Sequence, residues 1–171
     1  MQKYHNPTIL GLAVAGRTIL AILPHMELPY TVHDGLRRHV IPTDRCRDML
    51  AEVAATRANS YPEPQKVAAV VLTARGNRYA GVSYHTAIMA LTMHAEATAL
   101  AHAAIHGERA IVAITGPNCQ ACKQLIWESS LNAGIDIIVV MEEGEQLLRV
   151  PISAMMPYAW PTNHWATPHD Q

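Results

Sequence analysis

The sequence lacks any strong excess of charge, which limits the partners that it can have. Its 13 lysines and arginines nearly balance its 14 aspartates and glutamates, and the net charge at pH 7 is −1. One small basic cluster, Arg37, Arg38 and His39, does not change this balance. A near-neutral chain gives no sign of a groove for a phosphate backbone or of a patch for an acidic membrane. We therefore expect a small-molecule substrate, and neither nucleic acid nor membrane as a partner.

Cysteine is also scarce. The chain has three cysteines, and two of them form a C-x-x-C motif. Three cysteines make a poor disulfide framework, whereas a C-x-x-C in a reducing compartment is typical of a metal or redox site. This composition predicts a cytoplasmic protein.

A long uninterrupted hydrophobic run is missing as well. The most apolar stretch, TILGLAVAGRTILAILP, is divided by Arg17 and is too short to span a bilayer. Its AVAG resembles a signal peptidase site, but only one lysine precedes it. We favour a buried or oligomer-facing helix over a signal peptide.

Length and composition predict one compact domain, because 171 residues that are half apolar can bury a sizeable core. We expect residues 1–42 to form an N-terminal extension. It would comprise the apolar helix, which offers an oligomer contact, and an irregular loop, PHMELPYTVHDG. Residues 43–160 would form the main domain, and residues 161–171 a polar tail.

Within the main domain, a helix is expected from Thr43 to the prolines of ANSYPEP, with Met49, Leu50 and Val53 on one face. A hairpin should follow in KVAAVVLTARGNRYAGVSY, because Gly76 supplies a position with positive φ.

The second half of the domain alternates helices and strands. We expect a helix over residues 93–106, a buried strand in ERAIVAIT, and a helix from the C-x-x-C to about residue 134. A buried strand, IDIIVVM, and an edge strand, QLLRV, should follow. This order predicts an α/β fold, a three-layer α-β-α sandwich with a mixed sheet of about five strands. Residues 109–141 should form a parallel strand–helix–strand crossover.

Four reactive side chains stand at the beginnings of two of these helices. TMHAEATALAHAA carries His94 and Glu96, and GPNCQAC carries Cys119 and Cys122. Two thiolates and one imidazole make a neutral three-ligand zinc site whose fourth position is open to water. Glu96 need not be a ligand, and near a zinc-bound water it could pass a proton to a leaving group. H-x-E followed by P-C-x-x-C is the pattern of zinc deaminases that attack C4 of cytosine or C6 of adenine.

Other interpretations of these motifs stay open. The C-x-x-C alone fits a thiol–disulfide oxidoreductase or half of a structural zinc site, but neither gives a role to Glu96. A zinc-binding relative without catalysis, structural or ligand-binding, is a further alternative. His102 and His106 follow His94 on the same helix, but His102 lies about 12 Å along it. Both are interpreted as ordinary helix-face histidines.

Over residues 43–160 the chain resembles the cytidine deaminase family. HAEATALAHAAIHGERAIVAIT is similar to the bacterial dimeric members, VAAVVLTARGNRYAGVS to the family's hairpin, and SAMMPYAW to a motif near its C-terminus. The resemblance implies that His94, Cys119 and Cys122 bind zinc and that Glu96 shuttles protons. It also implies a homo-oligomer, dimeric or tetrameric.

The departures from the family pattern lie in the substrate pocket. Ser83 and His85 stand where family members carry the N-x-E that grips ribose, and they offer fewer acceptors and no anion. The blasticidin-S-type deaminases have a similar change. The chain contains no phenylalanine to pack on the pyrimidine, so Tyr61 is the expected substitute. Asn118 precedes the first ligand cysteine, and Ala95 is an expected contact beside His94.

These features together predict a zinc-dependent hydrolytic deaminase of an aminopyrimidine nucleoside or modified nucleoside. Zinc would lower the pKa of water, and the hydroxide would attack C4. Glu96 would protonate N3 and then the departing ammonia. The backbone amide of Cys119 could stabilise the developing oxyanion.

Overall fold

The computed structural model describes residues 28–61, 66–116 and 119–157. The apolar run of residues 8–24, Asn118 and the tail of residues 161–171 lie outside these ranges, so the expectations for them stay predictions. Within the described ranges, no helix has the length and apolar character needed to cross a bilayer.

A mixed five-stranded sheet forms the centre of the molecule, with the strand order β4-β3-β5-β6-β7. The strands are β3 (Ala68–Thr73), β4 (Arg78–Val82), β5 (Ile111–Thr115), β6 (Ile138–Glu143) and β7 (Gln146–Pro151). β5 and β6 run parallel, and the other neighbouring pairs run antiparallel. The expected hairpin, parallel crossover and edge strand are therefore confirmed.

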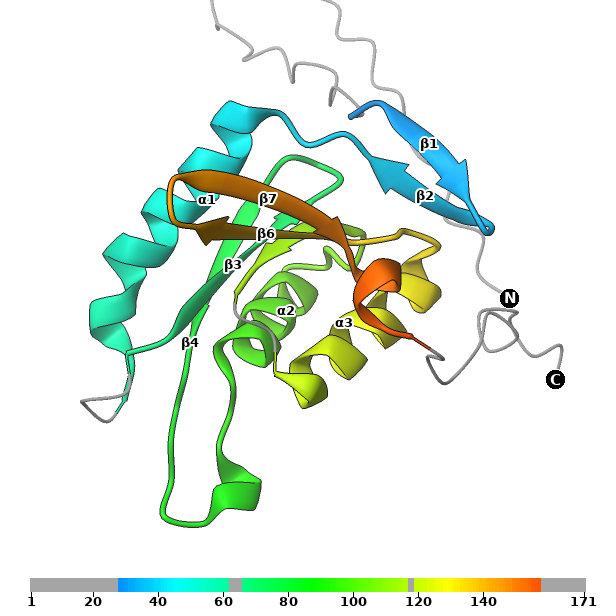
Figure 1. Cartoon of the computed structure of the whole chain (residues 1–171). Helices are drawn as coiled ribbons and strands as arrows, with labels where there is room; N and C mark the ends of the chain where they lie inside the picture. The colour runs from blue at the N-terminus through cyan, green and yellow to red at the C-terminus, as the bar shows by residue number, and fades with distance from the viewer. Residues whose placement is uncertain (1–27, 62–65, 117–118, 158–171) are drawn as a thin grey trace, which may run out of the picture.

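Helices cover both faces of this sheet, as expected for a three-layer sandwich. α1 (Thr43–Thr56) lies on one face, and α2 (Ala95–Ile105) and α3 (Gln120–Ala133) lie on the other (Figure 1). All residues of β3 and β5 are buried, because both strands are central and covered on two sides. The core continues into α1 through Cys46, Met49 and Val53.

The close approach of α2 to β4 depends on one glycine. A Cβ atom at Gly81 would lie 2.2 Å from the backbone nitrogen of Ala99 and 2.5 Å from the carbonyl oxygen of Ala95. No side chain larger than hydrogen fits there without moving the helix. Gly81 therefore fixes the distance of α2 from the sheet, and with it the position of the side chains at the start of α2.

A two-stranded hairpin, β1 (Tyr30–His33) and β2 (Leu36–His39), precedes α1 where the sequence suggested irregular chain. Its turn is Asp34–Gly35, and both residues have positive φ, 49° and 80°. Asp-Gly is a strong signal for such a turn, but the prolines on its N-terminal side favoured the interpretation as irregular chain. Arg38 fixes the hairpin to the main domain through an ion pair of 2.7 Å with the buried carboxylate of Asp136.

Candidate metal centre and its pocket

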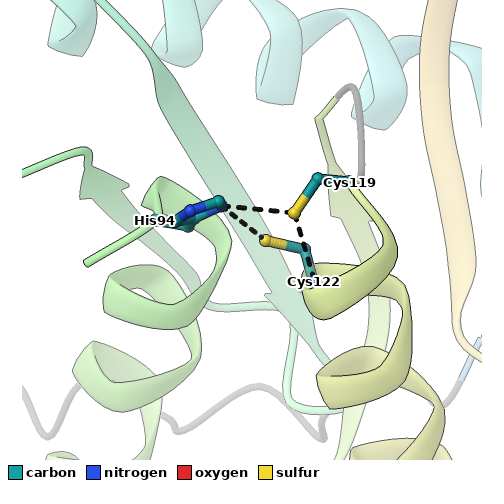
Figure 2. A group of neighbouring side chains, drawn as sticks. All are labelled: His94, Cys119 and Cys122. Atoms are coloured by element: carbon teal, nitrogen blue, oxygen red, sulfur yellow. Dashed lines mark hydrogen bonds between the residues drawn. The ribbon is translucent and has the colours of Figure 1, made fainter. Parts of the chain in front are cut away.

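The beginnings of α2 and α3 bring three metal-ligating side chains together. His94 is the N-cap of α2, and Cys119 is the N-cap of α3, so both have extended backbone just before a helix. Cys122 lies in the first turn of α3, and its backbone N–H donates to the sulfur of Cys119. Figure 2 shows the three side chains converging from the two helices.

The geometry of this group fits a zinc ion. Nδ1 of His94 lies 3.3 Å from the Sγ atom of Cys119 and 3.3 Å from that of Cys122. All three candidate ligand atoms lie within 4.8 Å of one another. Tetrahedral zinc with bonds of about 2.0–2.1 Å to nitrogen and about 2.3 Å to sulfur places those atoms about 3.6 Å apart. Small side-chain adjustments are therefore enough to accept the ion.

The environment of Cys122 favours its protonated form while no metal is bound. Burial raises the pKa of this thiol well above its usual range, and the carboxylate of Glu96 and the neighbouring Cys119 raise it further. Because zinc binds the thiolate, metal binding must release this proton.

Glu96 is held at the same centre, in the first turn of α2, and its side chain is 3% exposed. The carboxylate of Glu96 is close to Cys122. The Glu96 side chain also lies against Gly116, the residue that follows β5. A Cβ atom at Gly116 would lie 3.2 Å from Oε1 of Glu96, and its φ of +141° also favours glycine. Gly116 belongs to none of the motifs identified in the sequence, although a glycine directly after a buried strand is a usable signal.

A pocket of about 150 Å³ opens beside these residues. It is lined by Val67, Ser83, His85, His94, Ala95, Glu96 and Cys119. The structure thus brings Ser83, His85 and Ala95 to the same pocket as Glu96 and two of the candidate ligands, His94 and Cys119. Tyr61 is absent from the described lining residues. It is 57% exposed and stacks on Tyr84 with ring centroids 5.0 Å apart.

The side chain of His85, which lines this pocket, has a buried nitrogen atom, Nε2, without a hydrogen-bond partner among the described residues. The backbone N–H of His85 donates to the carbonyl of Tyr61 at 2.7 Å. A buried polar atom without a partner costs free energy in the absence of ligand. Such an atom beside a pocket is available for a hydrogen bond to a bound molecule.

The other two histidines of α2 point to a different part of the molecule. Nδ1 of His102 donates to the carbonyl of Ala80 at 2.9 Å, and the ring of His106 stacks on Tyr79. Neither belongs to the metal-ligating group of His94, Cys119 and Cys122 found in the described chain. Both pack against β4, as helix-face residues do.

Comparison with known proteins identifies the family of this arrangement. Residues 43–141 match the family model described as the cytidine and deoxycytidylate deaminase zinc-binding region. A cytidine deaminase from Cronobacter sakazakii is 31% identical over 135 residues, which are 77% of this chain and 45% of that relative. A cytidine deaminase from Salmonella dublin is 35% identical over 92 residues, 52% of this chain and 31% of the relative. The chain thus spans less than half the length of these curated relatives.

Solved structures support the same fold. The cytidine deaminase from Burkholderia pseudomallei superposes with a TM-score of 0.58 at 23% identity, covering 67% of this chain and 98% of that one. The enzyme from Mycobacterium leprae gives a TM-score of 0.54 at 20% identity, with 65% and 96% coverage. With the family model matching more than half of its length, this chain belongs to the cytidine and deoxycytidylate deaminase family, whose zinc-binding region includes the His94, Cys119 and Cys122 cluster.

Proposed function

We propose that this protein is a zinc-dependent hydrolytic deaminase of an aminopyrimidine, as a nucleoside or a modified nucleoside. The observation that carries the proposal is that Glu96 lines the same small pocket as the candidate ligands His94 and Cys119. A purely structural zinc site has no need of an acid–base group at an open pocket. A thiol–disulfide pair would leave His94, 3.3 Å from both sulfurs, without a role.

His94, Cys119 and Cys122 would hold the metal. When bound, zinc lowers the pKa of water and makes it a nucleophile at neutral pH. Two thiolates and a neutral imidazole cancel the charge of the ion, so the site carries no net charge apart from Glu96. Attachment of the ligands to two separate helices also fixes the metal relative to the pocket.

Glu96 would move the protons of the reaction. Its carboxylate takes a proton from the attacking water and delivers it to N3 of the ring as C4 becomes tetrahedral. A second transfer through Glu96 protonates the amino group, which leaves as ammonia while the C4 carbonyl forms. The backbone N–H of Cys119, at the N-terminus of α3, would stabilise negative charge on the C4 oxygen.

The size of the pocket supports a single-ring substrate. A cavity of about 150 Å³ is one that holds a molecule such as benzene. One pyrimidine ring therefore fits, and any sugar or other N1 substituent must extend beyond it. Ser83 and His85 line the pocket and are the proposed substrate contacts, together with Ala95; Tyr61 and Asn118 remain predicted contacts.

The proposal is tested by measuring zinc content and ammonia release on the purified chain. Cytidine, deoxycytidine, cytosine, blasticidin S and adenosine form the substrate panel. We expect one zinc per chain and ammonia from a cytosine-containing compound. Bound zinc without ammonia from any pyrimidine would contradict the proposal and favour a non-catalytic zinc protein.

The homo-oligomer implied by the resemblance to the family is also part of the proposal. Light scattering of the purified chain measures it directly. A dimer or tetramer is expected, and a monodisperse monomer would contradict it.

A further inference from the structure

A second hollow adjoins the ring-sized pocket. It is a groove of about 510 Å³ between α1 and the end of the sheet at which β5 and β6 finish, and it shares Val67 with the smaller pocket. Gly116, on its other side, separates it from Glu96. Crevices at the carboxyl ends of parallel strands are common ligand sites in open α/β sheets. The groove is thus in the right place to receive whatever part of a substrate lies outside the smaller pocket.

The groove carries two cations and one anion among its described lining residues. Arg57 lies in the short 3-10 helix Arg57–Asn59 that follows α1, Lys66 directly precedes Val67, and Glu142 lies on β6. Both cationic residues are exposed to solvent. No residue of the described chain forms an ion pair or side-chain hydrogen bond with Arg57. A guanidinium without a partner beside a pocket is well suited to a carboxylate or a phosphate.

We propose that this groove binds an anionic substituent of the substrate through Arg57 and Lys66. This inference rests on the deaminase function proposed above and specifies the class of substrate: an aminopyrimidine that carries a carboxylate or a phosphate. The ring occupies the pocket beside Glu96, and the substituent passes Val67 into the groove. Val67 lines both hollows, and Lys66, its neighbour in the chain, provides the first cation beyond the ring.

The test is a binding comparison in the zinc-loaded full chain. Titration calorimetry in the Glu96→Gln background measures deoxycytidine, deoxycytidine 5′-monophosphate and cytidine 5′-carboxylate without turnover. We expect at least one anionic ligand to bind about tenfold more tightly than deoxycytidine, as one charge-assisted contact would provide. Tighter binding of the phosphate alone or of the carboxylate alone identifies the source of the anion. The advantage should shrink as salt is added.

Substitutions in the groove sharpen the test. Arg57→Gln should remove most of the advantage of the anionic ligand and leave deoxycytidine binding unchanged. Glu142→Gln should strengthen anion binding, because it removes the only carboxylate among the described groove residues. Arg45→Gln is the matched control, since Arg45 is an exposed arginine in the first turn of α1, about 16 Å along the helix from its last residue, Thr56.

Three results would overturn the inference. They are equal affinity for neutral and anionic ligands, an Arg57→Gln variant that weakens deoxycytidine as much as the anions, and no binding of any of the three compounds. The deaminase proposal has a separate readout, because ammonia release by the unsubstituted protein does not depend on these affinities. Ammonia from cytidine with no preference for anions would keep the function and remove the anion site.

Discussion

Helix α2 has a buried glutamate at each end, and the two have different surroundings. Glu96, 3% exposed, lies in the first turn beside Cys122 and lines the pocket. Glu108, 7% exposed, lies just beyond the last turn. Its carboxylate accepts hydrogen bonds from Thr73, Asn77 and Tyr79. Three donors from β3, β4 and the turn between them thus surround the carboxylate of Glu108, whereas Glu96 lines a pocket.

The difference fits the two roles that we propose, a structural charge at Glu108 and a proton-transfer group at Glu96. Burial by itself raises the pKa of Glu108, but the hydrogen bonds from Thr73, Asn77 and Tyr79, together with the charge of Arg75, lower it overall. Glu108 therefore stays ionised and ties the β3–β4 turn to the end of α2. Glu96 instead lines a pocket of about 150 Å³, which is the position that the proposed proton transfer to a bound ring requires.

The largest expected effect is the loss of turnover on substitution of Glu96. Glu96→Gln should lower kcat about 10²- to 10⁴-fold, because the amide cannot transfer the proton. Zinc content and the unfolding temperature should stay close to those of the unsubstituted chain. Ammonia release, metal analysis and thermal unfolding measure the three quantities, and Glu108→Gln, which should keep turnover, is the matched control for ammonia release. Substantial turnover by Glu96→Gln would remove Glu96 from the mechanism.

Zinc removal should come next in size. A chelator should lower the unfolding temperature, because the metal links the beginnings of α2 and α3. At free zinc about 1,000 times its Kd, the stabilisation is about 4 kcal/mol. Cys122→Ala should abolish zinc binding, whereas Cys46→Ala, which alters the buried cysteine of α1, should keep it. Calorimetric unfolding with and without chelator tests this, and an unchanged midpoint would mean that zinc contributes nothing to folding.

Gly81→Ala should displace the N-terminal half of α2, where Glu96 lies. Its new methyl group would overlap the backbone at Ala95 and Ala99, so we expect a loss of about 3 kcal/mol. Because α2 must shift, activity should fall as well. Denaturant unfolding and ammonia release are the measurements. A variant with normal stability and activity would show that α2 can move away from β4 without cost.

The smallest expected effect belongs to Glu108. Its lowered pKa contributes stability that is present above the pKa of an unfolded glutamate, about 4.3, and is lost as the pH falls through the lower folded value. Glu108→Gln should therefore cost about 2 kcal/mol at pH 7, and this cost should shrink progressively as the pH falls below about 4.3. Urea unfolding at several pH values measures this. A penalty independent of pH would assign the effect to packing rather than to charge.

The sequence predicted the main elements and the metal cluster for local reasons. Gly76 marks a turn, and Gly134 marks the end of a helix. The H-x-E and C-x-x-C motifs lie at the beginnings of two helices that can be predicted from local sequence. Alternating helices and strands then allow few arrangements, so the mixed sheet follows. The proximity of His94 to the two cysteines could be predicted once β5 and the helices before and after it were assigned correctly.

Several other contacts between segments that lie far apart in the sequence could not be predicted from it. The stacking of Tyr61 on Tyr84, for example, joins residues that no motif connects, and the contact of Tyr61 with the substrate ring stays a prediction. The groove that contains Arg57 and Lys66 arises only when α1 packs on the sheet, and neither residue belongs to a recognisable motif. The donors around Glu108 come from residues 29 to 35 positions earlier in the chain, and no periodicity indicates them.

The tight space between Gly116 and Glu96 restricts how this protein can change over generations. Ser83, His85 and the exposed groove residues line the two hollows, so substitutions there alter the surface offered to a bound molecule. Position 116 is closed to such substitution, because any side chain meets the Glu96 carboxylate and an unfavourable φ at once. In a library randomised along this wall of the pocket, selection for activity should recover many sequences, all with glycine at residue 116.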